Sequence, residues 1–263
     1  MGFVSCHDVP RVPWAFGPGT EVATAVRELN MSFRSIRNSR ALLPFRATES
    51  AAVDGAPVGD AIVVVSGLPR SGTSMMMQML AAAGIEPLTD GTRVPDRDNP
   101  KGYFEWEPIK QISKDHRILR RKDVHGKAIK VISTLLPELP KAYQYKVLFI
   151  QRDIREIVTS QTLMLSANNK PEASQDRREM ERKLAAHNDK IISWAKDAPH
   201  LDVLILSHRE MIRKPDPQIA DIVAFLGPGV VQRPEAMAGE IDGSLYRNRN
   251  AGLLADFKDF FRS

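Results

Sequence analysis

The stretch VVVSGLPRSGTSMMMQ, residues 63–78, constrains the fold more than any other part of the chain. An apolar, β-branched run comes first, a glycine-rich turn from Gly67 to Gly72 follows, and a helical pattern begins at Ser74. Such a turn between a buried strand and a helix aims backbone N–H groups and the positive end of the helix dipole at one point. The sequence therefore predicts a strand–loop–helix unit whose loop binds an anion.

Strands alternate with helices over most of the chain. Apolar runs predict strands at residues 61–67, 127–133, 145–151 and 202–208, and helical spacing predicts helices at 74–84, 153–166, 172–198 and 217–227. Helices between strands form right-handed crossovers, which produce a parallel sheet. We therefore predict an α/β fold of three layers, in which helices flank a central, mostly parallel sheet. Ligands of such sheets bind at the carboxyl ends of the strands, where the loop lies.

The first part of the chain follows a different pattern. Pro and Gly are frequent up to residue 20, one amphipathic helix is predicted from Thr20, and a linker of small residues ends at Asp60. We divide the chain into an N-terminal extension, residues 1–56, and an α/β domain, residues 57–263. The extension is interpreted as a packing appendage, with a lid over an acceptor site or a dimer arm as the alternatives.

Composition narrows the function classes. The chain has 263 residues, a formal net charge of +5 and 43% apolar residues, which suits one large domain with a sizeable core. Lys and Arg are scattered rather than gathered in one tract, which favours an anionic small ligand over nucleic acid. No apolar run approaches the roughly 18 to 20 residues that cross a membrane. A single cysteine, Cys6, and the lack of a secretory pattern lead us to expect a cytoplasmic protein.

The glycine-rich loop lacks the lysine of nucleotide-hydrolysing phosphate loops. Thr73 stands at that position, and Arg70 lies inside the loop instead. In nucleotide hydrolases and kinases, the lysine reaches the terminal phosphates while Mg²⁺ bridges them. The apolar strands of this chain end in SG, ST, QR and SH, without a clear carboxylate for Mg²⁺. The sulfuryl group of a phosphosulfate carries less charge than a terminal phosphoryl group, so its binding needs neither the loop lysine nor Mg²⁺.

Histidine and cysteine give no metal-binding pattern. None of the six histidines stands at metal-ligand spacing from another histidine or from Cys6, so we expect no metal. His116 and His187 fall in charged helical stretches, which predicts that both are solvated. His208 follows a predicted strand and is the one histidine that we consider as a possible base.

The loop sequence GLPRSGTS resembles the 5′-phosphosulfate loop of the P-loop sulfotransferases, including their bacterial-type members, which use 3′-phosphoadenosine 5′-phosphosulfate (PAPS) as donor. VLFIQRDIREIVTSQ carries a second resemblance, because Arg152 ends a strand and Ser160 follows in the next helix. An arginine and a serine at this spacing hold the 3′-phosphate in that family, and the two side chains can converge on one phosphate. An ion pair of Arg152 with Asp153 or Glu156 is the alternative.

The resemblance extends over residues 61–250 with less specific motifs. HLDVLILSHREMIRKPDPQIADIVAFLG resembles the late strand, polar turn and helix of the family, although the family often has Tyr-Glu-Asp where this chain has residues 208–210. DGSLYRNRN resembles a basic motif in which Arg247 and Arg249 would close over the 3′-phosphate. The resemblance further implies roles in the loop: Arg70 and Lys130 would stabilise the leaving phosphate, and the 5′-phosphosulfate would be bound by Arg70, Ser71, Gly72, Thr73 and Ser74.

The general base is the part of the resemblance that fails. Small-molecule sulfotransferases use a histidine in a Lys-Thr-His-Leu-Pro stretch, whereas IKVISTLLP has Lys130 but no histidine. Other branches use a carboxylate after the first helix, and Asp90 stands in that place. Glu105 and Glu107, in GYFEWEP, are the alternatives, since aromatic neighbours can raise the pKa of a carboxyl group. A plain structural reading of this stretch, as core aromatics with a helix-capping acid, stays open.

The resemblance implies an enzyme that moves a sulfuryl group from PAPS to a hydroxyl or amine by in-line displacement, with a carboxylate as base and no metal. Its partners would be PAPS, the product 3′,5′-adenosine bisphosphate (PAP), and a small-molecule, carbohydrate or peptide acceptor, with no nucleic acid. Two other functions remain: a non-catalytic module of the same fold that binds PAPS or PAP, and a nucleotide kinase or NTPase with a degenerate loop.

Overall fold

The structure is a computed structural model, which describes residues 61–95, 99, 101–120, 124–167, 177–227 and 229–243. The N-terminal extension predicted at residues 1–56 lies outside the described residues, as do Arg247 and Arg249. The domain boundary at residue 57 therefore stays a prediction.

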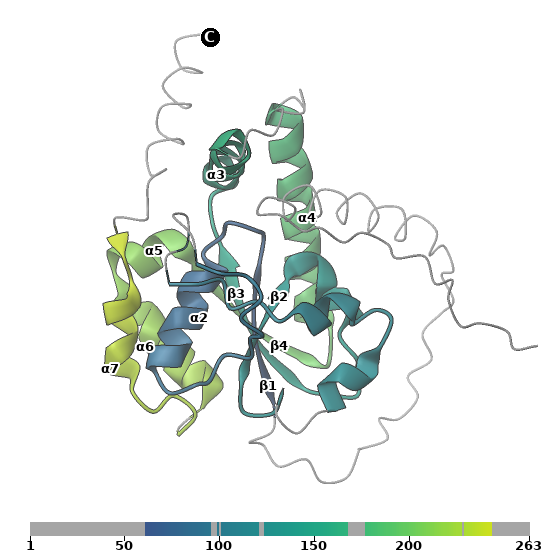
Figure 1. Ribbon diagram of the computed structural model, residues 1–263, viewed down its shortest axis with the longest axis vertical. Coiled ribbons are helices and arrows are strands. Elements are labelled where there is room, and N and C mark those ends of the chain that lie inside the picture. Colours follow the sequence, from purple (N-terminus) through teal and green to yellow (C-terminus); the bar gives the residue numbers. More distant parts are fainter. Residues whose placement is uncertain are drawn as a thin grey trace, which may run out of the picture.

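A four-stranded parallel sheet forms the centre of the described domain (Figure 1), with the spatial order β2-β1-β3-β4. The strands are β1 Ile62–Gly67, β2 Ala128–Ile132, β3 Tyr145–Gln151 and β4 Leu201–Ser207. Gly67, at the end of β1, is in register with Ile132 on one side and with Ile150 on the other. Because the chain runs from β1 to β2 on one side and then to β3 on the other, the strand order reverses at β1 and β3. Such a switch point opens a ligand-binding crevice at the carboxyl edge of a sheet.

Helices cover both faces of the sheet. They are α2 Thr73–Ala82, α3 Ile154–Ala167, α4 Arg177–Asp197, α5 His208–Arg213, α6 Pro215–Leu226 and α7 Pro234–Met237. Successive residues of a strand point to opposite faces, so Val63 and Val65 pack with α2, α5, α6 and α7, whereas Ile62 and Val64 pack with α4. Figure 1 shows α2, α6 and α7 on one side of the sheet and α4 on the other. The predicted three-layer α/β fold is confirmed.

The predicted elements agree with the observed ones to within a few residues, and the differences are short elements. The polar turn predicted after the last strand is wrong, because residues 208–213 form α5. This helix has six residues, and the Ser207 side chain caps it by accepting from the Glu210 N–H. An element of under two turns shows no helical period in the sequence. The same holds for α7 and for the 3₁₀ segments Glu107–Gln111, His116–Arg120, Ser133–Glu138 and Ala238–Glu240.

Candidate functional site

The glycine-rich loop folds back over the end of β1. Gly67 and Gly72 have positive φ angles of 151° and 103°, and Arg70 has a φ of 72°, which is uncommon for a residue with a side chain. A Cβ atom on Gly67 would lie 2.5 Å from Ser71 Oγ and 2.7 Å from the Ile150 carbonyl oxygen, so glycine is required there. Leu68 is buried against Ile157 of α3 and Leu184 of α4, which anchors the loop. The loop conformation is therefore set by contacts with β3, α3 and α4.

The loop has the features of an anion site. Gly72 is the N-cap residue of α2 and makes no side-chain cap bond, and the first turn of this helix contains no acidic residue. Ser71 Oγ is buried and has no hydrogen-bond partner among the described residues. Backbone N–H groups at a helix start and a buried hydroxyl both need acceptors. The oxygens of a bound phosphate group fit this need.

Lys130 brings a cation to the loop from the neighbouring strand. Its Nζ donates to Ser74 Oγ at 3.1 Å and to the Tyr103 carbonyl oxygen at 2.9 Å. Ser74 occupies the Ser/Thr position of the loop, and the residue before it, Thr73, stands where the loop lysine of nucleotide hydrolases would be. Lys130 of β2 thus supplies an ammonium group to a loop whose own sequence lacks one.

Three predicted phosphate-binding residues lie together at the switch point between β1 and β3. Arg70 Nε donates to Ser160 Oγ at 3.0 Å, and Arg152 Nη1 donates to the Arg70 carbonyl oxygen at 3.0 Å. These bonds join the loop after β1 to the end of β3 and to α3. Arg152 also makes the ion pair considered as the alternative, because its Nε lies 2.9 Å from Glu156 Oε2. Both sequence interpretations of Arg152 thus describe the same cluster.

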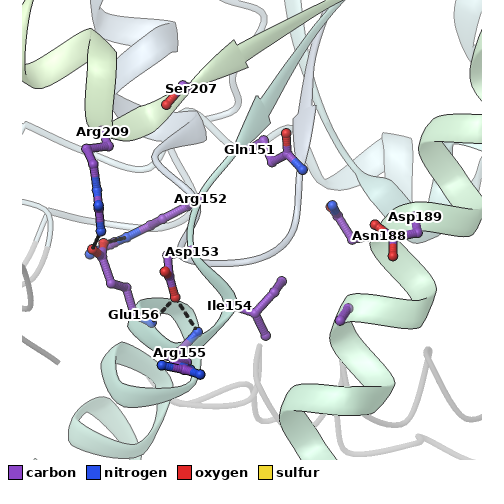
Figure 2. A pocket seen from close by; sticks show the side chains of 11 residues that line it. Gln151, Arg152, Asp153, Ile154, Arg155, Glu156, Asn188, Asp189, Ser207 and Arg209 are labelled. Carbon is purple, nitrogen blue, oxygen red and sulfur yellow. Dashed lines mark hydrogen bonds and ion pairs between the residues drawn. The ribbon is translucent and has the colours of Figure 1, made fainter. Parts of the chain in front are cut away.

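A second arginine pairs with the same glutamate. Arg209 Nη2 lies 3.2 Å from Glu156 Oε1, and the Glu156 side chain is only 1% exposed. Figure 2 shows Arg152 and Arg209 approaching Glu156 from the ends of β3 and β4. Sequence reasoning missed Arg209, since residues 208–210 depart from the family pattern and no role could be carried over. The only signal was an arginine directly after a predicted strand.

His208 supports the loop rather than serving as a base. Burial, and then the positive charge of Arg152, lower the pKa of His208 to about 3, so the ring is neutral at pH 7. A Cβ atom on Gly72 would lie 2.4 Å from His208 Cδ2, which means that the ring packs directly against the loop glycine. A buried group with such a low pKa is a poor proton acceptor near neutrality.

Asp90 has a capping role in the structure. Its Oδ2 accepts from the Glu107 N–H at 2.6 Å and its Oδ1 accepts from the Thr92 N–H at 3.0 Å. Burial raises the pKa of Asp90, but these N–H bonds outweigh it and hold the pKa below its usual value. This direction is opposite to the one that a general base needs. The plain structural reading of this stretch, a helix-capping acid, describes the geometry of Asp90.

Glu105 is the partly buried carboxylate of the three, with a side chain 11% exposed. Its Oε1 lies 2.8 Å from Arg93 Nη1, and Arg93 in turn stacks on the Tyr103 ring at 3.3 Å. The Tyr103 carbonyl accepts from Lys130, so this segment is tied to the anion loop. Glu107 is exposed and pairs with Lys110 at 2.7 Å.

The prediction that His187 is solvated is wrong. His187 is buried, and its Nε2 lies 3.1 Å from Ser133 Oγ, just after the end of β2. Burial, and then the charge of Lys190, lower its pKa. A signal was present in the sequence: Leu184, His187, Ile191 and Ala195 recur at helical spacing, which places His187 on the buried face of α4.

The described residues contain neither a metal-binding cluster nor a membrane-spanning helix. In the part of the chain that the structure describes, three or more His, Cys, Asp or Glu side chains nowhere gather in a way that could hold a metal ion. Among the described helices, none combines the length and the apolar character that a membrane span requires.

The fold and the site define an α/β protein with a glycine-rich loop at the switch point of a parallel sheet. A family model described as the sulfotransferase domain matches residues 60–238, which is more than half of the chain. The chain therefore belongs to the sulfotransferase domain family. No curated protein matches the chain significantly.

Solved structures with a similar fold include three of interest. A sulfotransferase from Alicyclobacillus acidocaldarius is 16% identical, with a TM-score of 0.42 over 74% of this chain and 92% of that one. Retinol dehydratase in a complex with retinol and PAP is 17% identical, with a TM-score of 0.42 over 72% and 67%. The sulfotransferase STF9 from Mycobacterium avium is 14% identical, with a TM-score of 0.38 over 83% and 74%. At these values the family assignment rests on the sequence match.

Proposed function

We propose that the protein is a PAPS-dependent sulfotransferase that acts on a hydroxyl or amine acceptor. Membership of the sulfotransferase domain family supports the class of reaction. The observation that carries the choice of donor is the pair of hydrogen bonds that joins Arg152, Arg70 and Ser160. Two guanidinium groups and a hydroxyl at the switch point suit a second phosphate, beyond the one that the loop binds.

The loop holds the 5′ end of the donor in this proposal. The Ser71 hydroxyl and the N–H groups at the start of α2 supply donors to the 5′-phosphosulfate, and Thr73 and Ser74 add hydroxyls. PAPS, when bound, supplies an activated sulfuryl group. Lys130 and Arg70 neutralise the negative charge that develops on the leaving phosphate, which is the electrostatic contribution that group transfer requires. A positive charge from β2 replaces the one that the loop sequence lacks.

The 3′-phosphate is the feature that distinguishes PAPS from ATP. In the proposal, Arg152 and Ser160 bind it, because each is hydrogen-bonded to Arg70. Arg247 and Arg249 would close over it from the C-terminal part of the chain.

We propose Glu105 as the first candidate for the general base. It is partly buried, and it lies two residues from Tyr103, whose carbonyl accepts from Lys130. Glu105 would take the proton of the acceptor while the acceptor oxygen or nitrogen bonds to sulfur and the bond from sulfur to the phosphate oxygen breaks. Asp90 and Glu107 remain weaker candidates, since the first caps backbone N–H groups and the second is exposed. The acceptor is a small molecule, a carbohydrate or a peptide.

Calorimetric titration with PAP, beside ADP with and without Mg²⁺, tests the donor assignment. We expect PAP to bind in the micromolar range or tighter without Mg²⁺, and Arg152→Ala to weaken it at least about tenfold, or 1.4 kcal/mol. Arg213→Ala is the matched control, because Arg213 is an exposed arginine of α5. Binding of ADP with Mg²⁺ and no preference for the 3′-phosphate would instead indicate a nucleotide kinase or NTPase.

Turnover separates an enzyme from a binding module. Release of PAP from PAPS is followed with a panel of phenols, sugars, amines and tyrosine peptides. An enzyme gives acceptor-dependent release, whereas PAP binding without release on any acceptor would support the non-catalytic alternative.

A further inference from the structure

The start of α5 contacts two parts of the proposed donor site. His208, its first residue, packs its ring against Gly72 of the anion loop. Arg209, the next residue, reaches Glu156 on the first turn of α3. The junction between β4 and α5 therefore lies between the loop and α3, beside the residues proposed for the 3′-phosphate.

Glu156 holds two guanidinium groups at once. Its two oxygens take one arginine each, Arg152 at 2.9 Å and Arg209 at 3.2 Å. The carboxylate is 1% exposed, whereas the Arg209 side chain is 50% exposed. A buried carboxylate orients an arginine that approaches it, and the planar guanidinium keeps further N–H donors for a second acceptor. Arg209 is thus oriented by Glu156, and its half-exposed side chain lines the groove described below.

Arg209 gives this cluster its positive excess. Because Arg70 is assigned to the leaving phosphate, the charges left for a second phosphate are those of Arg152, Arg209 and Glu156. Two arginines and one carboxylate leave an excess of one positive charge, and a phosphate monoester carries about −1.5 to −2 near pH 7. Without Arg209 this excess would be zero.

A groove of about 430 Å³ gives a ligand access to this cluster (Figure 2). Arg152, Glu156 and Arg209 line one end of it, and Asn188 and Asp189 of α4 line the opposite wall. The lining as a whole contains as many acidic residues as arginines, three of each. The charges of Arg152 and Arg209 lie together at the end of the groove where both approach Glu156.

We infer that Arg209 is a further arginine of the 3′-phosphate subsite and contributes to the selection of a 3′-phosphorylated nucleotide. This inference rests on the proposed PAPS-dependent function and adds a specificity-determining residue to it. Arg152 and Ser160 bind the phosphate from the β3 and α3 side, and Arg209 donates to it from the β4 side. Glu156 keeps the two guanidinium groups apart and oriented.

Calorimetry with PAP and 5′-AMP, which differ only in the 3′-phosphate, tests this role. Arg209→Gln should weaken PAP binding about tenfold and leave 5′-AMP binding within about twofold, because one charge-assisted hydrogen bond to the phosphate is lost. Arg209→Lys keeps the charge and should recover part of the loss. Arg213→Gln, which removes an exposed arginine from the same helix, should leave both affinities within about twofold.

Two results would overturn the inference alone: Arg209→Gln weakening PAP and 5′-AMP equally, or leaving PAP affinity unchanged, while the unmodified protein still prefers PAP. Equal affinity of the unmodified protein for PAP and 5′-AMP would overturn the proposed function, and the role of Arg209 with it. Circular dichroism of each variant checks that substitution of the half-exposed Arg209 side chain leaves the fold intact.

Discussion

The two sides of the proposed active site are built from different kinds of contact. On the donor side, which comprises residues 67–74, 152–160 and 208–209, several bonds join distant parts of the chain, in addition to the local pair of Arg152 with Glu156. Arg70 and Ser160 are 90 residues apart, and Arg152 and Arg70 are 82 apart. On the acceptor side, residues 88–107 with Lys110, the carboxylates pair with near neighbours. Glu105 is 12 residues from Arg93, and Glu107 is three from Lys110.

This difference shows which part of the site the fold itself fixes. The donor side is assembled wherever β1, β3 and β4 lie side by side, so its geometry follows from the sheet. The ion pairs of Glu105 and Glu107 on the acceptor side are local and partly exposed, although Lys101 of the same segment pairs with Glu240, 139 residues away. These carboxylates lie on a connecting segment, where binding residues are common, which suits recognition of an acceptor.

The largest expected effect lies on the acceptor side and concerns catalysis. With the acceptor that gives turnover in the panel, Glu105→Gln should lower kcat by about 10²- to 10⁴-fold, the usual contribution of a general base. PAP affinity should stay within about twofold, because the donor side is untouched. Glu107→Gln is the control and should retain most of the activity. Full activity in Glu105→Gln, combined with loss in Asp90→Asn, would transfer the role of base to Asp90.

Removal of Glu156 tests the rigidity of the donor side. Glu156→Ala leaves Arg152 and Arg209 without their shared carboxylate, and breaking a buried ion pair in this way costs about 3 to 5 kcal/mol of the free energy of unfolding. The exposed pair of Glu107 with Lys110 should contribute less than about 1 kcal/mol, so Glu107→Ala is the matched comparison. Urea denaturation measures both. Equal losses would mean that the two sides are held equally firmly.

Two glycines with positive φ allow a test of packing at the loop. Gly72 and Gly91 have φ angles of 103° and 66°, but a Cβ on Gly72 would collide with the His208 ring, whereas one on Gly91 would meet nothing within 4 Å. Gly91→Ala should therefore cost about 1 to 2 kcal/mol, from backbone strain alone. Gly72→Ala adds overpacking and should cost about 2 to 4 kcal/mol. Similar unfolding midpoints for the two variants would contradict the close packing of His208 on the loop.

The pH dependence of stability should also separate the two sides. The pKa of His208 falls from 6.5 to about 3 on folding, so the folded state binds fewer protons than the unfolded state. Its contribution to stability is present above pH 6.5 and is lost as the pH falls toward 3, with a loss of about 2 kcal/mol at pH 5. Asp90, whose pKa is lowered from 3.8, loses its contribution only below that value.

Thermal unfolding between pH 8 and pH 3 checks that the contribution of His208 to stability is lost at a higher pH than that of Asp90. His208→Asn should flatten the curve between pH 6.5 and pH 4, and Asp90→Asn should change it only below about pH 4. A His208→Asn variant that shows the same slope as the unmodified protein would exclude a buried neutral imidazole at this position.

The parts of the molecule that were predictable follow from local patterns. Apolar runs predicted β1 to β4, and glycine spacing predicted the loop at the carboxyl edge. The R-x₇-S spacing of Arg152 and Ser160 predicted two residues that the fold brings to one cluster.

The parts that were missed depend on packing between distant elements. Arg209 matters only because α5 places it beside Glu156, and six residues give no helical period from which α5 could be predicted. Asp90 looks like a base in the sequence, but its carboxylate accepts from the Thr92 N–H and from the N–H of Glu107, which begins a 3₁₀ segment that no pattern predicts. His187 is the exception, since its helical spacing with Ile191 already indicated burial.

In the proposed function, the switch point between β1 and β3 binds a nucleotide with two separate phosphates. A crystal structure of the complex with PAP would show where each phosphate lies. We expect the 5′-phosphate on the N–H groups of residues 70–74 and the 3′-phosphate within about 3.2 Å of both Arg152 and Ser160. A 5′-phosphate in the loop with the 3′-phosphate directed into solvent, away from both side chains, would rule out this binding mode.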